Sequence, residues 1–384
     1  MTVSKRYSKR ELNGLPTPDE IIVKDLADYI KVFSDENFTD YFFRGEPTNY
    51  NETISSALRD EVLNIGFNQR KEVQNGYSFL KMKEEFKREV WHKLSLDERM
   101  HFPAFSQHHG IPTNLVDITT SPLVALYFAC QGYTNDFNGE QFDEQCGFVY
   151  LFKNEFVDIT DVLTKFEDRN ILELFANNEE NTFLDMYNIF FEFKRKHSNG
   201  FILYFNKLIR DFHKYLGDDI IHMPLPEEVS SYEKDEYESS IFDYINYVLR
   251  YNKKIKKIYD NLQWISLDVF LYTAYLQIFL DNIQDGSIPI SWLNGLPIFK
   301  YAPILTFERG RNQQGLFIYQ TYIECTETVD DSPEVILQRI WPDKIIVINN
   351  KKNILKELDF MGINEKFIYG DYDNIANYIK RKFQ

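Results

Sequence analysis

The sequence predicts an α+β fold in which a mixed-sheet domain is interrupted by a mostly α-helical insertion. Two observations lead to this prediction. Short apolar segments of strand length occur towards both ends of the chain, whereas the middle has long helix-like segments rich in Phe, Tyr, Ile and Asn. We therefore expect residues 1–153 and 301–384 to form two parts of one domain, with residues 154–300 as the insertion.

The composition narrows the class of protein. The 384 residues are 43% hydrophobic, which is enough for a sizeable core, and the net charge is −16. This charge disfavours non-specific binding to nucleic acid or to an anionic membrane, and leaves only a local basic groove as an alternative. The three cysteines lack CxxC spacing, and the chain has neither an apolar leader nor a run of ~18 apolar residues. We therefore expect a soluble cytoplasmic protein without a disulfide framework.

The first elements follow from local spacing. Apolar residues recur at helical spacing over residues 20–33 and predict a helix, and the aromatic run Tyr41–Phe43 predicts a strand after it. Ser95 and Glu98 have the spacing of a capping box, which predicts a helix that runs towards Phe105.

The next elements are an apolar helix and a strand. Ser121 followed by Pro122 marks a helix start, because proline suits the first helical position and holds its predecessor in the extended conformation of an N-cap. The residues after it are apolar on all sides almost to Gly132, so we expect this helix to be enclosed. Gly147–Phe152 then predicts a buried strand.

The insertion and the C-terminal part complete the pattern. The acidic, proline-containing stretch Met223–Ser240 predicts an exposed loop between helices. Residues 302–308, 315–324 and 344–348 each predict a strand. Two helices are expected after these strands, the first of them ending at Gly362.

Three motifs resemble those of a known family. They are "YFFRGE" at Tyr41–Glu46, "QHHGIPTNLVDITTSPLVALYFA" at Gln107–Ala129 and "MGINEKFIYGDYDNIANYI" at Met361–Ile379. They are similar to the FRG domain family, which is named for its Phe-Arg-Gly motif and occurs in bacterial and phage-related proteins. The family usually has an arginine after the Pro-Thr pair and a tryptophan after the aspartate, where this chain has Asn114 and Ile118.

The resemblance implies a divergent member of the ADP-ribosyltransferase superfamily. It therefore implies NAD as co-substrate and a nucleic acid or a protein as acceptor, in a bacterial toxin or an anti-phage defence effector. That superfamily uses an arginine or histidine on an early strand, a hydroxyl segment before a helix, and a late glutamate or glutamine. The residues that match in this order are Arg44; Thr119, Thr120 and Ser121; and Glu308 or Gln314.

Arg44 and the hydroxyl segment each have a binding role and a structural alternative. Cleavage of NAD passes through an oxocarbenium-like state, so positioning and electrostatics supply most of the catalysis. Arg44 could hold a phosphate or a ribose hydroxyl with its fork of donors, or could instead pair with Glu46 or Asp117. The N-terminus of the helix after Ser121 could bind a pyrophosphate, or Ser121 could serve only as its cap.

Gln107, His108 and His109 lie where a helix is expected to end. A neutral imidazole there could act as base for an acceptor hydroxyl or amine, and adjacent side chains rarely face the same way, so we expect one histidine of the pair in the site. Gln107 and Asp117 are expected in cofactor binding. Asp117 could also orient that histidine, or hydrogen-bond the hydroxyl segment. Two neighbouring histidines without a spaced third ligand do not make a zinc site, so no metal is expected.

The late residue decides between several functions. A carboxylate at Glu308 would stabilise the developing cation at the ribose, whereas Gln314 would hold the ribose without a full charge; Glu324 is a weaker third candidate. Water in place of the acceptor would make the chain an NAD glycohydrolase. Without catalysis it would be a module that binds a nucleotide or nucleic acid. The insertion is expected to serve sensing, a regulatory partner or homo-oligomer formation.

Overall fold

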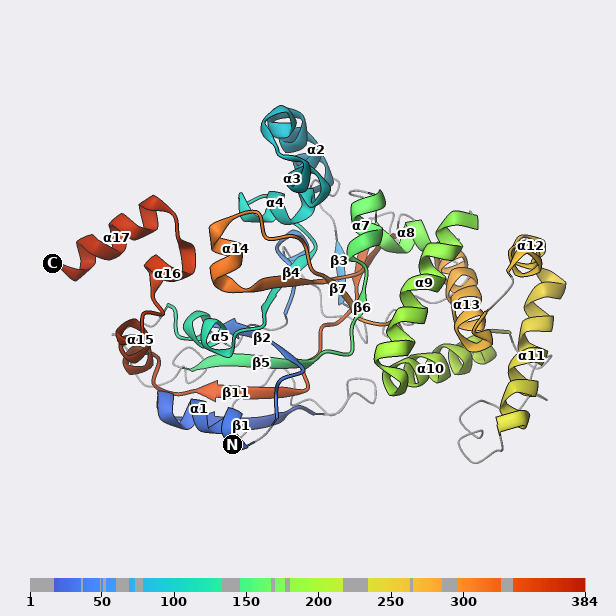
Figure 1. The fold of residues 1–384 in the computed structure, drawn as a ribbon, viewed down its shortest axis with the longest axis horizontal. Coiled ribbons are helices and arrows are strands. Elements are labelled where there is room, and N and C mark those ends of the chain that lie inside the picture. Colours follow the sequence, from blue (N-terminus) through green and yellow to red (C-terminus); the bar gives the residue numbers. More distant parts are fainter. Residues whose placement is uncertain are drawn as a thin grey trace.

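A mixed sheet forms the centre of the structure, which is a computed structural model (Figure 1). It has eight strands in the order β1-β11-β5-β2-β4-β8-β7-β6, and a smaller sheet has the order β3-β10-β9. The α+β class expected from the sequence is confirmed. The structure describes residues 17–35, 37–48, 50, 53–59, 69–72, 79–132, 146–166, 170–176, 180–216, 234–262, 265–284, 296–325 and 334–383.

The strands of the larger sheet come from distant parts of the chain. β1 is parallel to β11 and β6 is parallel to β7, whereas the neighbouring pairs between them are antiparallel. The larger sheet consists, in order, of β1 (Asp19–Val23), β11 (Lys344–Ile348), β5 (Gly147–Lys153), β2 (Tyr41–Glu46), β4 (Leu115–Thr119), β8 (Gly315–Tyr319), β7 (Phe299–Tyr301) and β6 (Val157–Asp158). The smaller, antiparallel sheet consists of β3 (Gln69–Glu72), β10 (Glu334–Leu337) and β9 (Tyr322–Cys325).

Helices from both ends of the chain pack on the sheet or on one another beside it. One apolar core joins the sheet to α1, α5 and α15, with buried side chains such as Tyr29, Leu126 and Ile354. In Figure 1, α14 lies between α4 above and α5 below. These helices are α1 (Leu26–Asp35), α2 (Phe79–Val90), α3 (Leu96–Met100), α4 (Phe102–His108), α5 (Pro122–Ala129), α14 (Glu308–Gln313), α15 (Lys351–Phe360), α16 (Glu365–Tyr369) and α17 (Tyr372–Lys382).

The middle of the chain forms a helical region beside the β6–β7 edge of the sheet (Figure 1). Its core is rich in aromatic side chains and continues into the sheet at Phe299 and Tyr319. Burial of α13 on most sides explains why its sequence is apolar almost throughout. The helices are α7 (Thr160–Phe166), α8 (Ile171–Ala176), α9 (Glu180–Lys196), α10 (Ser198–Leu216), α11 (Lys234–Tyr251), α12 (Lys253–Asn261) and α13 (Leu267–Gln284). The domain boundaries given above stay a prediction.

Glycine lets α5 lie directly on the sheet. A Cβ atom on Gly45 in β2 would be 1.9 Å from the carbonyl oxygen of Ala125, and one on Gly147 in β5 would be 2.1 Å from that of Ala129. Ala125 and Ala129 are one helical turn apart, so two adjacent strands receive the same face of α5. The glycine of the Phe-Arg-Gly run is therefore required by close backbone packing.

Several local predictions are confirmed. The capping box of Ser95 and Glu98 is formed at the start of α3. The Ser121 hydroxyl accepts a hydrogen bond from the N–H of Val124 and caps α5, whose residues are largely buried. Strands were expected, and occur, at β2, β5 and β11. These features depend on neighbours in sequence, which explains why the sequence alone predicts them.

Other predictions are wrong. Residues 19–23 form β1 because they pair with β11, so the helix expected from residue 20 begins only at Leu26. Residues 302–307 form no strand, because Pro303 cannot donate a ladder hydrogen bond, and α14 begins at Glu308.

Three boundaries also differ from the predictions. The helix after Ser95 is interrupted at His101, whose backbone leaves the helical region, and Pro103 lies in the first turn of α4. The strand expected over residues 315–324 is two strands, β8 and β9, in different sheets. Residues 234–240 belong to α11 and not to a loop, because they contain no proline or glycine and their Lys and Glu residues are good helix formers. The rest of the expected loop, residues 223–233, lies outside the described residues.

Candidate functional site

A cavity of about 300 Å³ lies where β2 and β4 diverge. In the described chain, β2 pairs with β4 at one position, Phe43 opposite Thr119, whereas β2 pairs with β5 over all six of its residues. The cavity is enclosed by these strands together with α4, α5 and α14. Its polar lining residues are Arg44, Gln107, His108, Asp117, Thr119, Arg309 and Gln313. Its apolar walls include Phe43, Phe128, Leu305, Phe307 and Phe317.

Arg44 is held firmly and still presents donors to the cavity. Its Nε donates to Glu46 Oε1 at 2.9 Å, and its Nη1 donates to the carbonyl oxygen of Asp117 at 2.7 Å. The Glu46 side chain is only 4% exposed, so this ion pair keeps a buried carboxylate satisfied. The Arg44 Nη2 group has no hydrogen-bond partner among the described residues. The ion pair with Glu46 that sequence offered as an alternative is therefore present, and it orients the guanidinium.

A short relay of hydrogen bonds orients Asp117. The N–H of Leu115 donates to Thr113 Oγ1 at 3.3 Å, so the Thr113 hydroxyl donates in turn to Gln107 Oε1. This contact leaves the Gln107 Nε2 group to donate to Asp117 Oδ1 at 2.9 Å. The other carboxylate oxygen accepts no hydrogen bond from the described residues. Asp117 is thus the one carboxylate among the described lining residues, with one oxygen fixed and one open to a ligand.

The alternatives considered for Asp117 are wrong. Its carboxylate orients neither histidine, because its one hydrogen bond in the described residues comes from Gln107. It does not bond the hydroxyl segment, because Thr119 holds that segment itself. The Arg44 side chain reaches the backbone oxygen of Asp117 and not its carboxylate.

His108 faces the cavity and His109 does not line it. The His108 ring stacks on Phe307 with centroids 3.9 Å apart and an angle of 15°. Burial, together with the charges of His109 and Arg309, lowers the pKa of His108 to about 4, although Asp371 opposes this shift. His108 is therefore neutral at neutral pH, and neither of its ring nitrogens has a partner in the described part of the chain. His109 is exposed and packs on Phe105.

The hydroxyl segment ties α5 to the end of α14. Thr119 Oγ1 donates to the carbonyl oxygen of Gln313 at 2.6 Å and accepts from the N–H of Ser121 at 2.9 Å. Thr120 Oγ1 donates to Gln314 Oε1 at 3.0 Å. Thr119 lines the cavity, whereas Thr120 and Ser121 do not. The segment therefore closes one side of the cavity through hydrogen bonds that link residues almost 200 positions apart.

The late candidates do not line the cavity. Glu308 packs against Gly370, where an added Cβ would be 3.1 Å from Glu308 Cγ. Gln314 has a left-handed backbone with φ of 48°, and its side chain accepts from Thr120. Glu324 lies in β9 of the smaller sheet. Their roles in catalysis stay a prediction.

Sequence reasoning missed Arg309 and Gln313. They are four residues apart on α14, so they share the face that lines the cavity, whereas Glu308 and Asn312 share another. Arg309 lies 5.0 Å from the centroid of Tyr369, and Gln313 Nε2 donates to the carbonyl oxygen of Ile368 at 3.2 Å. The spacing of a helix could have revealed this face, but the stretch was expected to connect strands.

The two departures from the family motif have different environments. Asn114, in the place of the usual arginine, is buried and donates to the carbonyl oxygen of Gln320 at 3.1 Å, away from the cavity. Ile118, in the place of the usual tryptophan, is buried and lines the cavity. The second guanidinium of the site comes from Arg309.

Two kinds of feature, a metal-binding cluster and a membrane-spanning helix, are absent from the described residues. No cluster of three His, Cys, Asp or Glu side chains in them is placed to hold a metal ion. Within the same ranges, no helix combines the length and the apolar character needed to cross a bilayer.

The cavity combines features that suit a nucleotide. Arg44 and Arg309 provide positive charge for phosphate, and the phenylalanine walls provide flat apolar surface for a base. Asp117 adds a carboxylate, and His108 adds a neutral imidazole that is able to accept a proton.

Comparison with known proteins agrees with the motifs. No curated protein and no solved structure matches the chain. Residues 39–138 match the family model of the FRG domain, and this range includes Arg44, Gln107, His108 and Asp117 but not α14. The chain therefore contains an FRG domain, and the motif residues of that domain line the cavity.

Proposed function

We propose that the cavity binds NAD and that the chain is an NAD-dependent ADP-ribosyltransferase, active as a bacterial toxin or an anti-phage effector. The observation that carries the proposal is the convergence of Arg44, His108 and Asp117 on one cavity from two motifs that are separated by 60 residues. Each of the three has a polar atom without a partner among the described residues. A site that only braces the fold would leave fewer such groups open.

Each residue has a distinct task in this reaction. Arg44 and Arg309 hold the phosphates of NAD, while Asp117 lies beside the ribose and stabilises the positive charge that develops as the bond from C1′ to nicotinamide breaks. The acceptor forms the new bond at C1′, and its proton passes to His108, which is neutral and therefore able to accept it. Gln107 keeps the Asp117 carboxylate in place.

The size of the cavity limits how NAD can bind. A volume of about 300 Å³ is at the lower end of the range for small-molecule sites. The cavity therefore takes one nucleotide half of NAD, and the other half extends out of it.

The test is nicotinamide release from NAD by the purified full chain, alone and with total cellular RNA, DNA or protein. We expect Arg44→Lys, which keeps the charge and loses the fork of donors, to lower the rate about 100-fold. Arg250→Lys, on α11 in the helical region, is the matched control and should leave the rate unchanged. Thermal unfolding of each variant confirms that it is folded. Equal rates for Arg44→Lys and the control would exclude this cavity as the site.

Comparing the assays with and without an added polymer distinguishes a transferase from a glycohydrolase. Release that requires one added polymer identifies a transferase and its acceptor class. Release without any polymer identifies an NAD glycohydrolase, in which water attacks C1′.

A second candidate is a module that binds a nucleotide without catalysis. It is favoured by one observation, that Glu308 and Gln314 lie outside the cavity lining. Calorimetric binding of NAD without nicotinamide release would support this candidate.

A further inference from the structure

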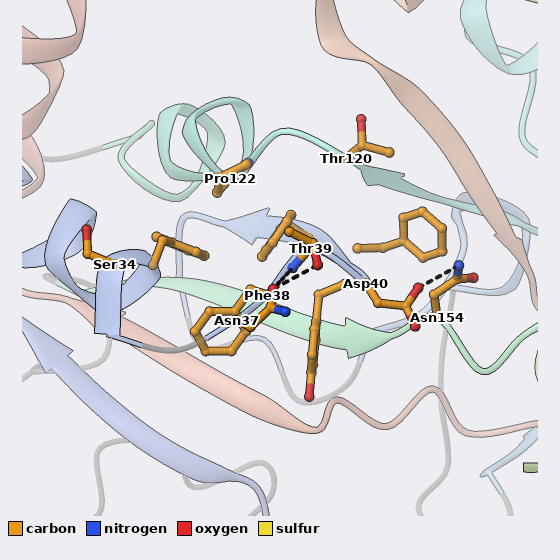
Figure 2. A pocket seen from close by; sticks show the side chains of 12 residues that line it. Ser34, Asn37, Phe38, Thr39, Asp40, Thr120, Pro122 and Asn154 are labelled. Carbon is orange, nitrogen blue, oxygen red and sulfur yellow. Dashed lines mark hydrogen bonds between the residues drawn. The ribbon is translucent and has the colours of Figure 1, made fainter. Parts of the chain in front are cut away.

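Two more cavities continue from the candidate site along the end of the sheet. The first, of about 550 Å³, lies at the start of β2 and is shown in Figure 2. Asn37, Thr39 and Asp40 line it on one side, and Thr120 and Pro122 line it on the other. The second, of about 650 Å³, lies between the ends of β6 and β7 and the helices α7 and α9.

Shared residues show that the three cavities adjoin. The candidate site and the first cavity share Phe43, and they are lined by the consecutive residues Thr119 and Thr120. The first and second cavities share Asn154, whose Nδ2 donates to Asp40 Oδ1 at 3.0 Å (Figure 2). We call the first and second cavities together the side groove. It leads from the candidate site to the helical region.

Aromatic stacking joins the two parts of the side groove. Phe42, which lines the first cavity, stacks on Phe156, which lines the second, with centroids 5.7 Å apart and an angle of 15°. Lys300, from the second cavity, lies 5.6 Å from the Phe42 ring. The floor between the cavities is therefore a packed surface.

The charge of the side groove is mainly negative. Among its described lining residues are five carboxylates, three lysines and no arginine. Two of the lysines are neutralised, Lys165 by Asp185 at 2.7 Å and Lys300 by Asp158 at 3.3 Å. Glu192 is neutralised by Arg195 at 2.6 Å. Asp40 and Asp161 have no ion pair in the described part of the chain. Lys196 is the remaining lysine.

The negative charge of the side groove favours a basic polypeptide over a nucleic acid as acceptor. A nucleic acid needs clustered Lys and Arg side chains to neutralise its phosphates, and the side groove lacks such a cluster among its described residues. A polypeptide with basic side chains would gain charge complementarity at Asp40 and Asp161. The Asn37 amide oxygen accepts from Thr39, which leaves the Asn37 Nδ2 group to donate to the polar backbone of an extended segment (Figure 2). Tyr41 and Phe42 suit the stem of a long side chain.

We propose that the side groove binds an extended basic segment of a protein. The role of the bound segment rests on the proposed function. Under that function the segment is the acceptor of ADP-ribose, and the groove leads it to the candidate site. The helical region then contributes directly, because α7 and α9 form one wall of the groove. Binding of the segment does not itself require NAD.

Fluorescence anisotropy of labelled ligands on the full chain at low ionic strength tests the proposal. The probes are a peptide of alternating Arg and Ser, the same peptide with Glu in place of Arg, and a single-stranded RNA of similar length. We expect the Arg peptide to bind at least about tenfold more tightly than either of the others. The variant Asp40→Lys with Asp161→Lys should lose at least about tenfold of that affinity.

A second double variant changes the net charge of the chain by the same amount but outside the groove. It therefore separates the effect of the groove from the effect of net charge. Asp243→Lys with Asp260→Lys changes exposed residues of α11 and α12, at the far side of the helical region (Figure 1), and should bind the Arg peptide like the unaltered chain. Equal losses in the two double variants would overturn the proposal, as would tighter binding of RNA or no binding of the Arg peptide.

The same samples distinguish failure of the groove from failure of the proposed function. If the Arg peptide binds in the groove but NAD is not cleaved, the proposed function fails and the groove stands. If NAD is cleaved but the Arg peptide does not bind, the groove fails and the proposed function stands.

Discussion

The two walls of the candidate site are built in different ways. The inner wall, formed by β2, β4 and α5, consists of buried apolar side chains and of backbone packed on Gly45 and Gly147. The outer wall, formed by α14, is held to α16 by the side-chain hydrogen bonds of Asn312 and Gln313 to the carbonyl oxygens of Phe367 and Ile368. Backbone packing leaves no room for adjustment, whereas exposed polar contacts are weak individually. We therefore expect changes in the inner wall to affect folding, and changes in the outer wall to affect binding.

The largest expected effect is at the inner wall. Gly45→Ala places a Cβ 1.9 Å from the Ala125 carbonyl oxygen, so α5 must move off the sheet. We expect the free energy of unfolding to fall by about 3 kcal/mol or more, measured by chemical denaturation. Gly315→Ala is the matched control, because its nearest atom would be 3.8 Å away, and it should cost less than about 1 kcal/mol. Similar losses at both positions would contradict the packing argument.

Asp117→Asn should separate catalysis from folding. The amide keeps the shape of the side chain but removes the charge that, under the proposed function, stabilises the developing cation, so we expect the rate of nicotinamide release to fall about 100-fold. Binding of NAD and the melting temperature should change little, because one Asp117 oxygen has no partner among the described residues. Asp260→Asn, on the exposed surface of α12, should keep full activity. A rate within a factor of three of the unaltered chain would show that Asp117 is not the carboxylate of the reaction.

His108 should make stability depend on pH between about 6.5 and 4. In this range the unfolded chain takes up a proton at His108 and the folded chain does not, so stability falls as the pH falls. Because the ring is partly exposed, we expect a loss of only about 1 kcal/mol. The measurement is the difference in unfolding free energy between pH 7 and pH 4.5, compared with the same difference in His108→Phe. His101 and His109 are present in both proteins and cancel, and identical differences would contradict the low pKa.

The smallest expected effect is at the outer wall. Asn312 Nδ2 donates to the carbonyl oxygen of Phe367 at 2.7 Å in an exposed contact, so Asn312→Ala should lower the free energy of unfolding by about 1 kcal/mol or less. We expect a several-fold weaker affinity for NAD in calorimetry, because α14 carries Arg309. Asn377→Ala, on the exposed face of α17, should change neither quantity. A loss of stability as large as that of Gly45→Ala would remove the distinction between the two walls.

The motif residues show how far sequence reasoning can go for a site. Arg44, Gln107, His108, Asp117 and Thr119 were all expected in the site, and all of them line one cavity. They could be named in advance because they lie in motifs that resemble those of the FRG domain family, whereas the pairing of β2 with β4, which brings Arg44 beside Asp117, is a contact between distant segments. Whether these residues act on NAD stays a prediction.

Reasoning from the sequence fails for the residues that α14 contributes to the cavity. Arg309 and Gln313 were missed, and Glu308 was selected, because the register of α14 decides which face of "ERGRNQQ" lines the cavity. That register depends on contacts with α16, more than 50 residues later.

The sequence by itself determined the elements whose causes are local. The cap of α5 at Ser121 and the capping box of α3 both follow from residue type and short spacing. Only the tertiary structure decided that residues 19–23 pair as β1, that α14 completes the cavity and that the side groove adjoins it. These features arise from contacts between residues far apart in the chain. The free energies of such contacts cannot be predicted from a local sequence pattern.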